Sequence, residues 1–315
     1  MKDIMVSVNM VTYNHEKYIA QAIEGVLMQK TTFPIELVIG EDCSPDRTRQ
    51  ICIEYRDKYP DIIKLLLPEK NIGSHRNGLN VLLACTGKYI AACEGDDYWT
   101  DPYKLQKQVD FLEANPEYSA CAHQCMTCCE YRDQPPEPYT TTTKDKFVIN
   151  DLFEGCKFHL ATIVIKRELM SMTIEPPNII SGDRFLFFIS AMFGPIKYLP
   201  DTMSVYRINC SSISTWVTPD LLKRDLNMVP WFVRLFPDFP KYRCLSFIHK
   251  TIIAYPSKVP FLTYLKHYSI YAWYSFSFFP KNLPSLFSFT FLTTPKFAVL
   301  RLFPNLKWKR LQSWR

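Results

Sequence analysis

Three short polar clusters in the first hundred residues could bind a cation or a polar ligand. Thr12-Tyr13-Asn14, Glu41-Asp42-Cys43-Ser44 and Glu94-Gly95-Asp96-Asp97 each follow an apolar segment. Adjacent carboxylates such as Asp96 and Asp97 repel each other, and a counter-ion relieves that cost. Carboxylate oxygens are ligands that a hard divalent cation prefers. Each acid could instead only cap the helix that follows it, so the clusters by themselves leave both interpretations open.

The segments around these clusters have the pattern of strands alternating with helices. Short apolar runs predict buried strands at residues 5–12, 35–40, 62–67 and 89–93. Apolar residues at helical spacing predict helices at residues 17–29, 46–58, 77–85 and 101–114. This order predicts a doubly wound, mostly parallel α/β sheet. Ligands bind outside the carboxyl ends of the strands in such sheets, where all three clusters fall.

The second half of the chain is less regular. We predict a strand at Phe158–Ile165 and a short helix at Asp183–Phe193, and from about Pro219 onward short helical stretches broken by prolines. We therefore expect a first domain at residues 1–218 and a helical extension at residues 219–315. Cys125 and Cys128 have the spacing of a zinc knuckle, but a second pair is missing and the segment reads as a strand. We favour a structural role for them.

Charge and aromatic residues are distributed unevenly along the chain. Residues 231–315 carry a net charge of +12 and 23 of the 46 aromatic residues, whereas residues 1–230 carry −6. This composition fits helices lying on an anionic membrane surface, a nucleic-acid-binding surface or a packed subdomain. We favour the membrane surface and expect no nucleic-acid partner. The sequence has no signal-peptide pattern and no uncharged apolar stretch of 18 residues, so we expect a cytoplasmic protein at the inner face of the cell membrane.

Three segments together resemble the family 2 glycosyltransferases, which have the GT-A fold. They are VSVNMVTYNHEKYIAQAIEGVLMQ, ELVIGEDCSPDRT and GKYIAACEGDDYWTDPYKLQKQVDFL, and the resemblance covers residues 4–215. It implies an inverting, metal-dependent enzyme of bacterial cell-surface polysaccharide synthesis. Such an enzyme moves a sugar from a nucleotide-sugar donor, here a UDP-sugar, to a hydroxyl of a glycan or lipid-linked glycan. The implied cofactor is Mn²⁺ or Mg²⁺.

The resemblance also implies roles for the polar clusters in donor binding. Thr12, Tyr13 and Asn14 would line the nucleotide pocket. Glu41-Asp42 resembles the family's "DDGS" element, in which an Asp contacts the base, and Asp42 matches that Asp. Asp96-Asp97 resembles the "DxD" element. Asp97 would bind the metal, and Asp96 would contact the sugar and ribose side of the donor.

Later segments supply the remaining implied roles. Ser181-Gly182-Asp183 resembles the "ED" element, whose Asp is the catalytic base, so the base would be Asp183. Arg207 belongs to a segment that resembles the closing "YRxH" element and would serve the diphosphate. Asn209 stands where a His is often found, Gly182 replaces a Glu, and Glu41 replaces an Asp.

Two other functions remain compatible with the sequence. The departures from the family pattern at Glu41, Gly182 and Asn209 would also fit a degenerate GT-A domain that acts as a binding or scaffold module. A sugar-nucleotidyltransferase would need a glycine-rich phosphate loop after the first strand, where this chain has Thr12-Tyr13-Asn14-His15. For His15 we favour a place in a solvated turn, and for His159 a structural role.

Overall fold

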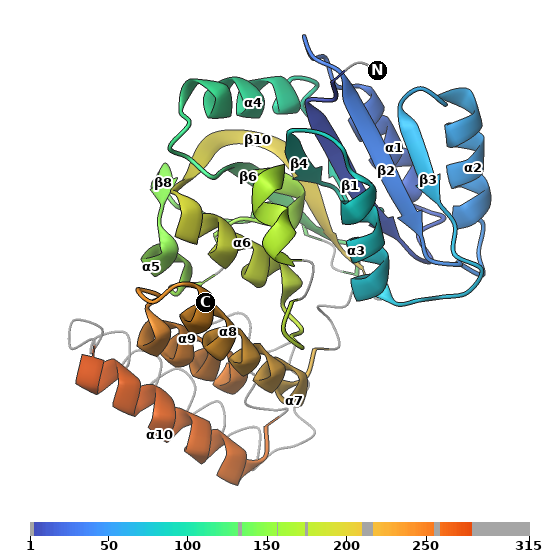
Figure 1. Cartoon of the computed structure of the whole chain (residues 1–315). Coiled ribbons are helices and arrows are strands. Elements are labelled where there is room, and N and C mark those ends of the chain that lie inside the picture. Colours follow the sequence, from blue (N-terminus) through green and yellow to red (C-terminus); the bar gives the residue numbers. More distant parts are fainter. Residues whose placement is uncertain are drawn as a thin grey trace. The chain divides into compact units, whose positions relative to one another are not determined.

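The structure is a computed structural model, and it describes residues 3–131, 134–155, 157–173, 176–209, 217–254 and 259–278 (Figure 1). The chain forms two compact units. The first contains Met1–Leu152, Cys156–Pro176 and Leu186–Ser212, and the second contains Phe153–Gly155, Pro177–Phe185 and Ile213–Arg315.

One mixed sheet organises the first unit. Its strands are ordered β3 (Ile63–Leu66), β2 (Ile35–Glu41), β1 (Val6–Thr12), β4 (Tyr89–Ala92), β9 (Val164–Lys166), β6 (Ala120–Cys129), β10 (Ile196–Ile208) and β5 (Tyr98–Trp99). Two short strands, β7 (Glu137–Pro138) and β8 (Lys146–Phe147), pair with β6 and β10. The strands of four or more residues all run in one direction, and the short ones run against them. This confirms the predicted α/β class with a mostly parallel sheet.

Helices cover both faces of this sheet. Val6, Val8 and Met10 alternate along β1 and share a buried core with α1 (Ile19–Leu27) and α2 (Thr48–Lys58). On the opposite face, α3 (Ser74–Ala84) packs against β1 and β2 (Figure 1). Further along the chain, α4 (Lys104–Ala114) packs against β6. Because successive side chains along β1 point to opposite faces of the sheet, this strand contributes side chains to both helical layers.

The predicted strand at Phe158–Ile165 is wrong in its first part. Leu160–Thr162 form a 3₁₀ turn, and only Val164–Lys166 form a strand, β9. The reason is a set of side-chain hydrogen bonds that hold this turn. The Nδ1 atom of His159 accepts the Ala161 amide at 3.3 Å, and Trp99 Nε1 donates to the Ala161 carbonyl at 2.9 Å. A propensity pattern cannot show bonds that come from distant elements.

Other boundaries differ only slightly from the expected ones. Helix α3 begins at Ser74, three residues before its predicted start, and α4 begins at Lys104. Cys125 and Cys128 lie on β6, the strand expected there. Because they are three residues apart on a strand, their side chains point to opposite faces of the sheet. The first unit also contains the short helix α5 (Ile149–Leu152) and a 3₁₀ segment at Arg167–Thr173.

The described part of the second unit is helical. Helix α6 (Gly182–Phe193) begins in it and continues into the first unit. It is followed by α7 (Pro219–Leu222), a 3₁₀ segment at Lys223–Asn227, α8 (Met228–Leu235), α9 (Lys241–Ile253) and α10 (Phe261–Phe278). Phe232 stacks on Phe239 with ring centroids 4.6 Å apart, so aromatic side chains form much of this core.

Within the described residues, no helix has both the length and the hydrophobicity needed to span a membrane. The rest of the basic and aromatic C-terminal segment, residues 279–315, lies outside the described residues.

Candidate active site

The carboxyl ends of β1, β2 and β4 meet at one edge of the sheet. Thr12 pairs in register with Glu41, and the Asp42 amide donates to the Thr12 carbonyl at 3.1 Å. On the other side of β1, the Gly95 amide donates to the Val11 carbonyl at 3.0 Å. A Cβ atom at Gly95 would lie 2.5 Å from Thr12 Oγ1, so only glycine allows this approach. The three predicted clusters therefore lie together.

Asp97 is the most deeply buried acid of its cluster, with 1% of its surface exposed. Its Oδ1 accepts the Arg207 backbone amide at 2.9 Å, while its Oδ2 has no hydrogen-bond partner. Burial raises the pKa of Asp97 well above its usual value, and the charges of Asp96 and Glu94 raise it further. A buried carboxylate oxygen without a donor is costly unless a proton or a cation compensates it.

Two more potential ligand atoms lie beside Asp97. Glu94, Asp97 and His159 each offer one atom, and these atoms lie within 4.8 Å of one another. Nδ1 of His159 is 3.4 Å from Oδ2 of Asp97. Burial lowers the pKa of His159 to about 3, so the imidazole is neutral at physiological pH and can bind a metal. These groups have the chemistry of a divalent-cation site.

Residues from other elements hold the His159 ring in place. Tyr206 on β10 stacks on it with ring centroids 4.0 Å apart. The Gln108 side chain on α4 donates to the Thr162 carbonyl at 2.9 Å and so supports the adjacent 3₁₀ turn. The sequence did not point to His159 as a candidate ligand, because nothing in the segment 158–165 indicates that its turn lies against the carboxylates.

Arg207 and Asn209 organise the loop that carries Asp96. The Arg207 guanidinium donates to the Asp96 carbonyl at 2.7 Å and to Gln21, and it lies 4.3 Å from the centre of the Tyr98 ring. Asn209 donates to Asp96 Oδ2 at 3.1 Å. Arg207 is 8% exposed. Arg207 and Asn209 therefore hold the Asp96-Asp97 segment in place through hydrogen bonds.

The Glu41-Asp42 pair is held by the chain around it. Glu41 is fully buried, and its carboxylate accepts the Ser44 amide at 2.7 Å and Arg49 Nε at 2.5 Å. The two oxygens of Asp42 accept the amides of Ile72 and Gly73 at 2.8 and 2.9 Å. Glu41 thus closes the turn after β2, and Asp42 orders the loop before α3.

The other predicted donor residues lie in the turn after β1. Tyr13 is 41% exposed, and Asn14 adopts a left-handed backbone with φ of 58° while its amide donates to Ser44 Oγ at 3.0 Å. His15 lies in the same turn, with Nε2 3.9 Å from Asp96 Oδ2.

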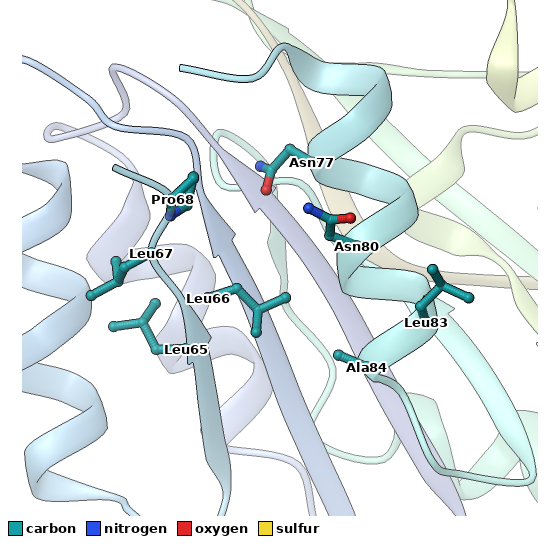
Figure 2. A pocket seen from close by; sticks show the side chains of 8 residues that line it. All are labelled: Leu65, Leu66, Leu67, Pro68, Asn77, Asn80, Leu83 and Ala84. Atoms are coloured by element: carbon teal, nitrogen blue, oxygen red, sulfur yellow. The ribbon is translucent and has the colours of Figure 1, made fainter. Parts of the chain in front are cut away.

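A groove of about 580 Å³ lies beside this edge but does not include its acids. Figure 2 shows it between the end of β3 and α3, with the lining residues Leu65, Leu66, Leu67, Pro68, Asn77, Asn80, Leu83 and Ala84. Asn77 is buried and donates to the Gly40 carbonyl at 2.7 Å, which joins α3 to β2. The groove therefore lies on the face of the sheet that α3 covers.

Asp183 lies in the first turn of α6, as the sequence predicted for a residue that opens a helix. Within the second unit, Asp225 anchors the residues before it. The Asp225 carboxylate accepts the amides of Ile180 and Ser181 at 3.0 and 3.1 Å and the Ser181 hydroxyl at 2.6 Å. Asp225 is 1% exposed and was not singled out from the sequence.

A mostly parallel sheet with helices on both faces and acids at its carboxyl edge is the architecture expected of a GT-A domain. Similar solved structures agree. The chain matches Staphylococcus aureus TarS in complex with UDP-GlcNAc with a TM-score of 0.66 and 17% identity, over 86% of this chain and 81% of TarS. It matches the mannosyltransferase PcManGT of Pyrobaculum calidifontis, in complex with GDP-Man and Mn²⁺, with a TM-score of 0.53 and 16% identity, over 97% and 90% of the two chains.

The sequence comparison gives the family. The model for glycosyl transferase family 2 matches residues 7–162, and this part of the chain belongs to that family. It is 38% identical over 208 residues to the uncharacterized protein Rv1520 of Mycobacterium tuberculosis, covering 66% of this chain and 60% of that protein's length. It is 28% identical over 236 residues to the Escherichia coli β-1,3-glucosyltransferase WfgD, covering 74% and 88%.

Proposed function

We propose that this protein is an inverting glycosyltransferase that moves a sugar from a UDP-sugar to a hydroxyl of a glycan or lipid-linked glycan in cell-surface polysaccharide synthesis. The observation that carries the proposal is the buried Asp97 oxygen beside Glu94 and His159, at the edge where Thr12, Asp42 and Asp96 converge. The names of relatives such as WfgD, a UDP-glucose-dependent transferase, support the donor class.

The described residues fit a divalent cation, Mn²⁺ or Mg²⁺. Asp97 supplies a buried oxygen without a donor, and Glu94 and His159 supply further ligand atoms. When bound, such a cation would neutralise the charge that develops on the departing nucleoside diphosphate. The complex of PcManGT with GDP-Man and Mn²⁺ supports this chemistry in the same fold. Asp96, oriented by Asn209, would accept hydrogen bonds from the donor on its sugar and ribose side.

Thr12, Tyr13, Asn14, Glu41 and Asp42 would form the nucleotide part of the site. Asp42 would contact the base, since its carboxylate is held at the edge by two backbone amides. The exposed Tyr13 ring could lie against the nucleotide. Glu41 would act indirectly by closing the turn that presents Asp42. Arg207 would serve the diphosphate chiefly by holding the Asp96-Asp97 loop.

Asp183 would be the general base. A hydroxyl is a poor nucleophile, and a carboxylate that removes its proton during attack makes direct displacement with inversion feasible. Asp225 fixes the residues before Asp183, which is the support that a positioned base requires.

We further propose that residues 1–218 act as the catalytic domain and residues 219–315 as an extension that binds the inner face of the cell membrane. Helix α10 supports the membrane role. Leu262, Leu265 and Trp273 are 79, 42 and 56% exposed, and their spacing places them along one side of the helix. Apolar side chains on the surface of a helix, with basic residues nearby, fit an in-plane membrane contact.

The test is a screen of nucleotide sugars with the full-length protein. We expect one UDP-sugar to be hydrolysed slowly, and to raise the melting temperature, in a manner that requires Mn²⁺ or Mg²⁺. Thermal stabilisation without turnover by any nucleotide sugar, even with lipid-linked acceptors added, would support a binding module instead. Formation of nucleotide sugar from a nucleoside triphosphate and a sugar phosphate would identify a nucleotidyltransferase.

A further inference from the structure

His159 and Asp97 place two hydrogen-bond acceptor atoms close together, Nδ1 of the imidazole and Oδ2 of the carboxylate. Nδ1 of His159 accepts the Ala161 amide at 3.3 Å, so this nitrogen presents a lone pair rather than a proton. It also lies 3.4 Å from Oδ2 of Asp97, which has no donor of its own. Two lone-pair atoms this close repel, and either a proton or a cation between them removes the repulsion.

The geometry favours a cation over a proton. Neighbouring ligands of one cation, each about 2.1 Å from it, are separated by about 3.0–3.5 Å, which matches the distance between the His159 and Asp97 atoms. The Glu94 carboxylate extends the group to three potential ligands from two segments of the chain.

The surroundings of His159 resemble the support that metal-bound histidines receive. Tyr206 stacks on the ring, and Trp99 and Gln108 hold the carbonyls of the turn that follows. A ligand needs such orientation to bind tightly. The other nearby imidazole, His15, has Nε2 3.9 Å from Asp96, and its Nδ1 is 3.1 Å from Thr12 Oγ1. It does not belong to the three-ligand group.

We propose that His159 is a cation ligand together with Asp97 and Glu94, and that this nitrogen gives the site a preference for Mn²⁺ over Mg²⁺. The inference rests on the proposed function, which requires a cation at Asp97. Mg²⁺ strongly prefers oxygen ligands, whereas a transition metal accepts imidazole. Binding through Nδ1 exchanges the 3.3 Å bond from Ala161 for the metal bond, since the nitrogen has one lone pair.

Cation binding to the full-length protein tests this directly, without turnover. Mn²⁺ is followed by electron paramagnetic resonance, with and without UDP, and Mg²⁺ by its competition for the Mn²⁺ site. His159→Asn keeps a side-chain acceptor for the turn but removes the imidazole. We expect it to weaken Mn²⁺ binding by about tenfold or more and Mg²⁺ binding much less. His159→Asp, which supplies an oxygen, should restore binding with a reduced preference for Mn²⁺.

His15→Asn is the nearby control and His75→Asn, at an exposed position on α3, the remote one. Both should leave Mn²⁺ affinity unchanged. If Asp97→Asn abolishes Mn²⁺ binding while His159→Asn keeps its affinity and preference, the inference is wrong and the proposed function stands. If the unaltered protein binds neither cation, the inference and the metal dependence both fail, and the donor screen still decides whether the protein is a transferase.

Discussion

The backbone amide of Arg207 donates a 2.9 Å hydrogen bond to Oδ1 of Asp97, across 110 residues of sequence. This bond occupies one carboxylate oxygen and leaves the other directed at His159, 3.4 Å away. The same Arg207 binds the Asp96 carbonyl through its guanidinium. Strand β10 therefore positions both acids of the Asp96-Asp97 pair, one through the backbone and the other through a side chain.

Asp97→Asn should abolish cation-dependent donor binding while the protein remains folded. The amide oxygen can still accept the Arg207 N–H, and its NH₂ group can donate to His159, but the charge that attracts the cation is lost. Titration of UDP with and without Mn²⁺ measures this, with the exposed Asp110→Asn as the matched control. UDP affinity that is the same in EDTA and in the variant would rule out a metal at Asp97.

Asp183→Asn should lower kcat by about 10²-fold or more and leave donor affinity nearly unchanged, because the amide cannot accept the proton of the acceptor hydroxyl. Initial rates and a donor titration measure the two quantities. Asp220→Asn, at an exposed carboxylate of the same unit, is the control and should retain full activity. Full transfer by the Asp183 variant would mean that another group is the base.

Gly95→Ala should disturb the Asp96-Asp97 loop. The added methyl would lie 2.5 Å from Thr12 Oγ1 and 2.7 Å from Thr12 Cβ, so the loop must move away from β1. Overpacking of this kind costs about 1–3 kcal/mol of stability, and we expect weaker Mn²⁺ binding as well. Gly78→Ala, where the methyl would meet only Val11 at 3.9 Å, is the control and should be neutral or stabilising in denaturant unfolding. Equal behaviour of the two variants would contradict the close approach.

Lys104 should make the stability of the protein depend on pH above neutrality. Its side chain is fully buried, with Nζ 2.8 Å from Gln108 Oε1 and 4.1 Å from the centre of the Trp99 ring. Burial lowers the pKa of Lys104 from 10.5 to about 7. Between about pH 7 and 10.5 the unfolded chain therefore holds a proton that the folded protein has released, so stability rises with pH in this window.

Lys104→Met removes the amine that binds this proton in the unfolded chain. Relative to the variant, the free energy of unfolding of the unaltered protein should increase by about 1.4 kcal/mol per pH unit in this window. Urea unfolding at pH 7.5, 8.5 and 9.5 gives the comparison. Parallel curves for the two proteins would mean that Lys104 stays charged in the folded state.

The C-terminal segment should bind anionic vesicles. Residues 231–315 carry a net charge of +12, and basic residues near such a surface contribute about 1 kcal/mol each. In flotation experiments with the full-length protein, binding should increase with anionic lipid content, weaken with salt and persist in part, since aromatic side chains also contribute. Replacing Lys307, Lys309 and Arg310 by Glu should reduce it. Retention only by nucleic acid, lost completely in salt, would contradict the membrane interpretation.

The sequence by itself determined the fold class and the edge of the sheet at which the candidate site residues lie. Alternating β and α patterns define a parallel sheet, and acids directly after Gly40 and Cys93 must lie at its carboxyl edge, because strand direction brings those ends together. What only the tertiary structure decided is which of these groups lack a partner. Glu41 is neutralised by Arg49, whereas Asp97 keeps one oxygen without a donor beside His159. Those differences arise from contacts between segments far apart in the chain, and local patterns of residue type carry no information on the distances that create them.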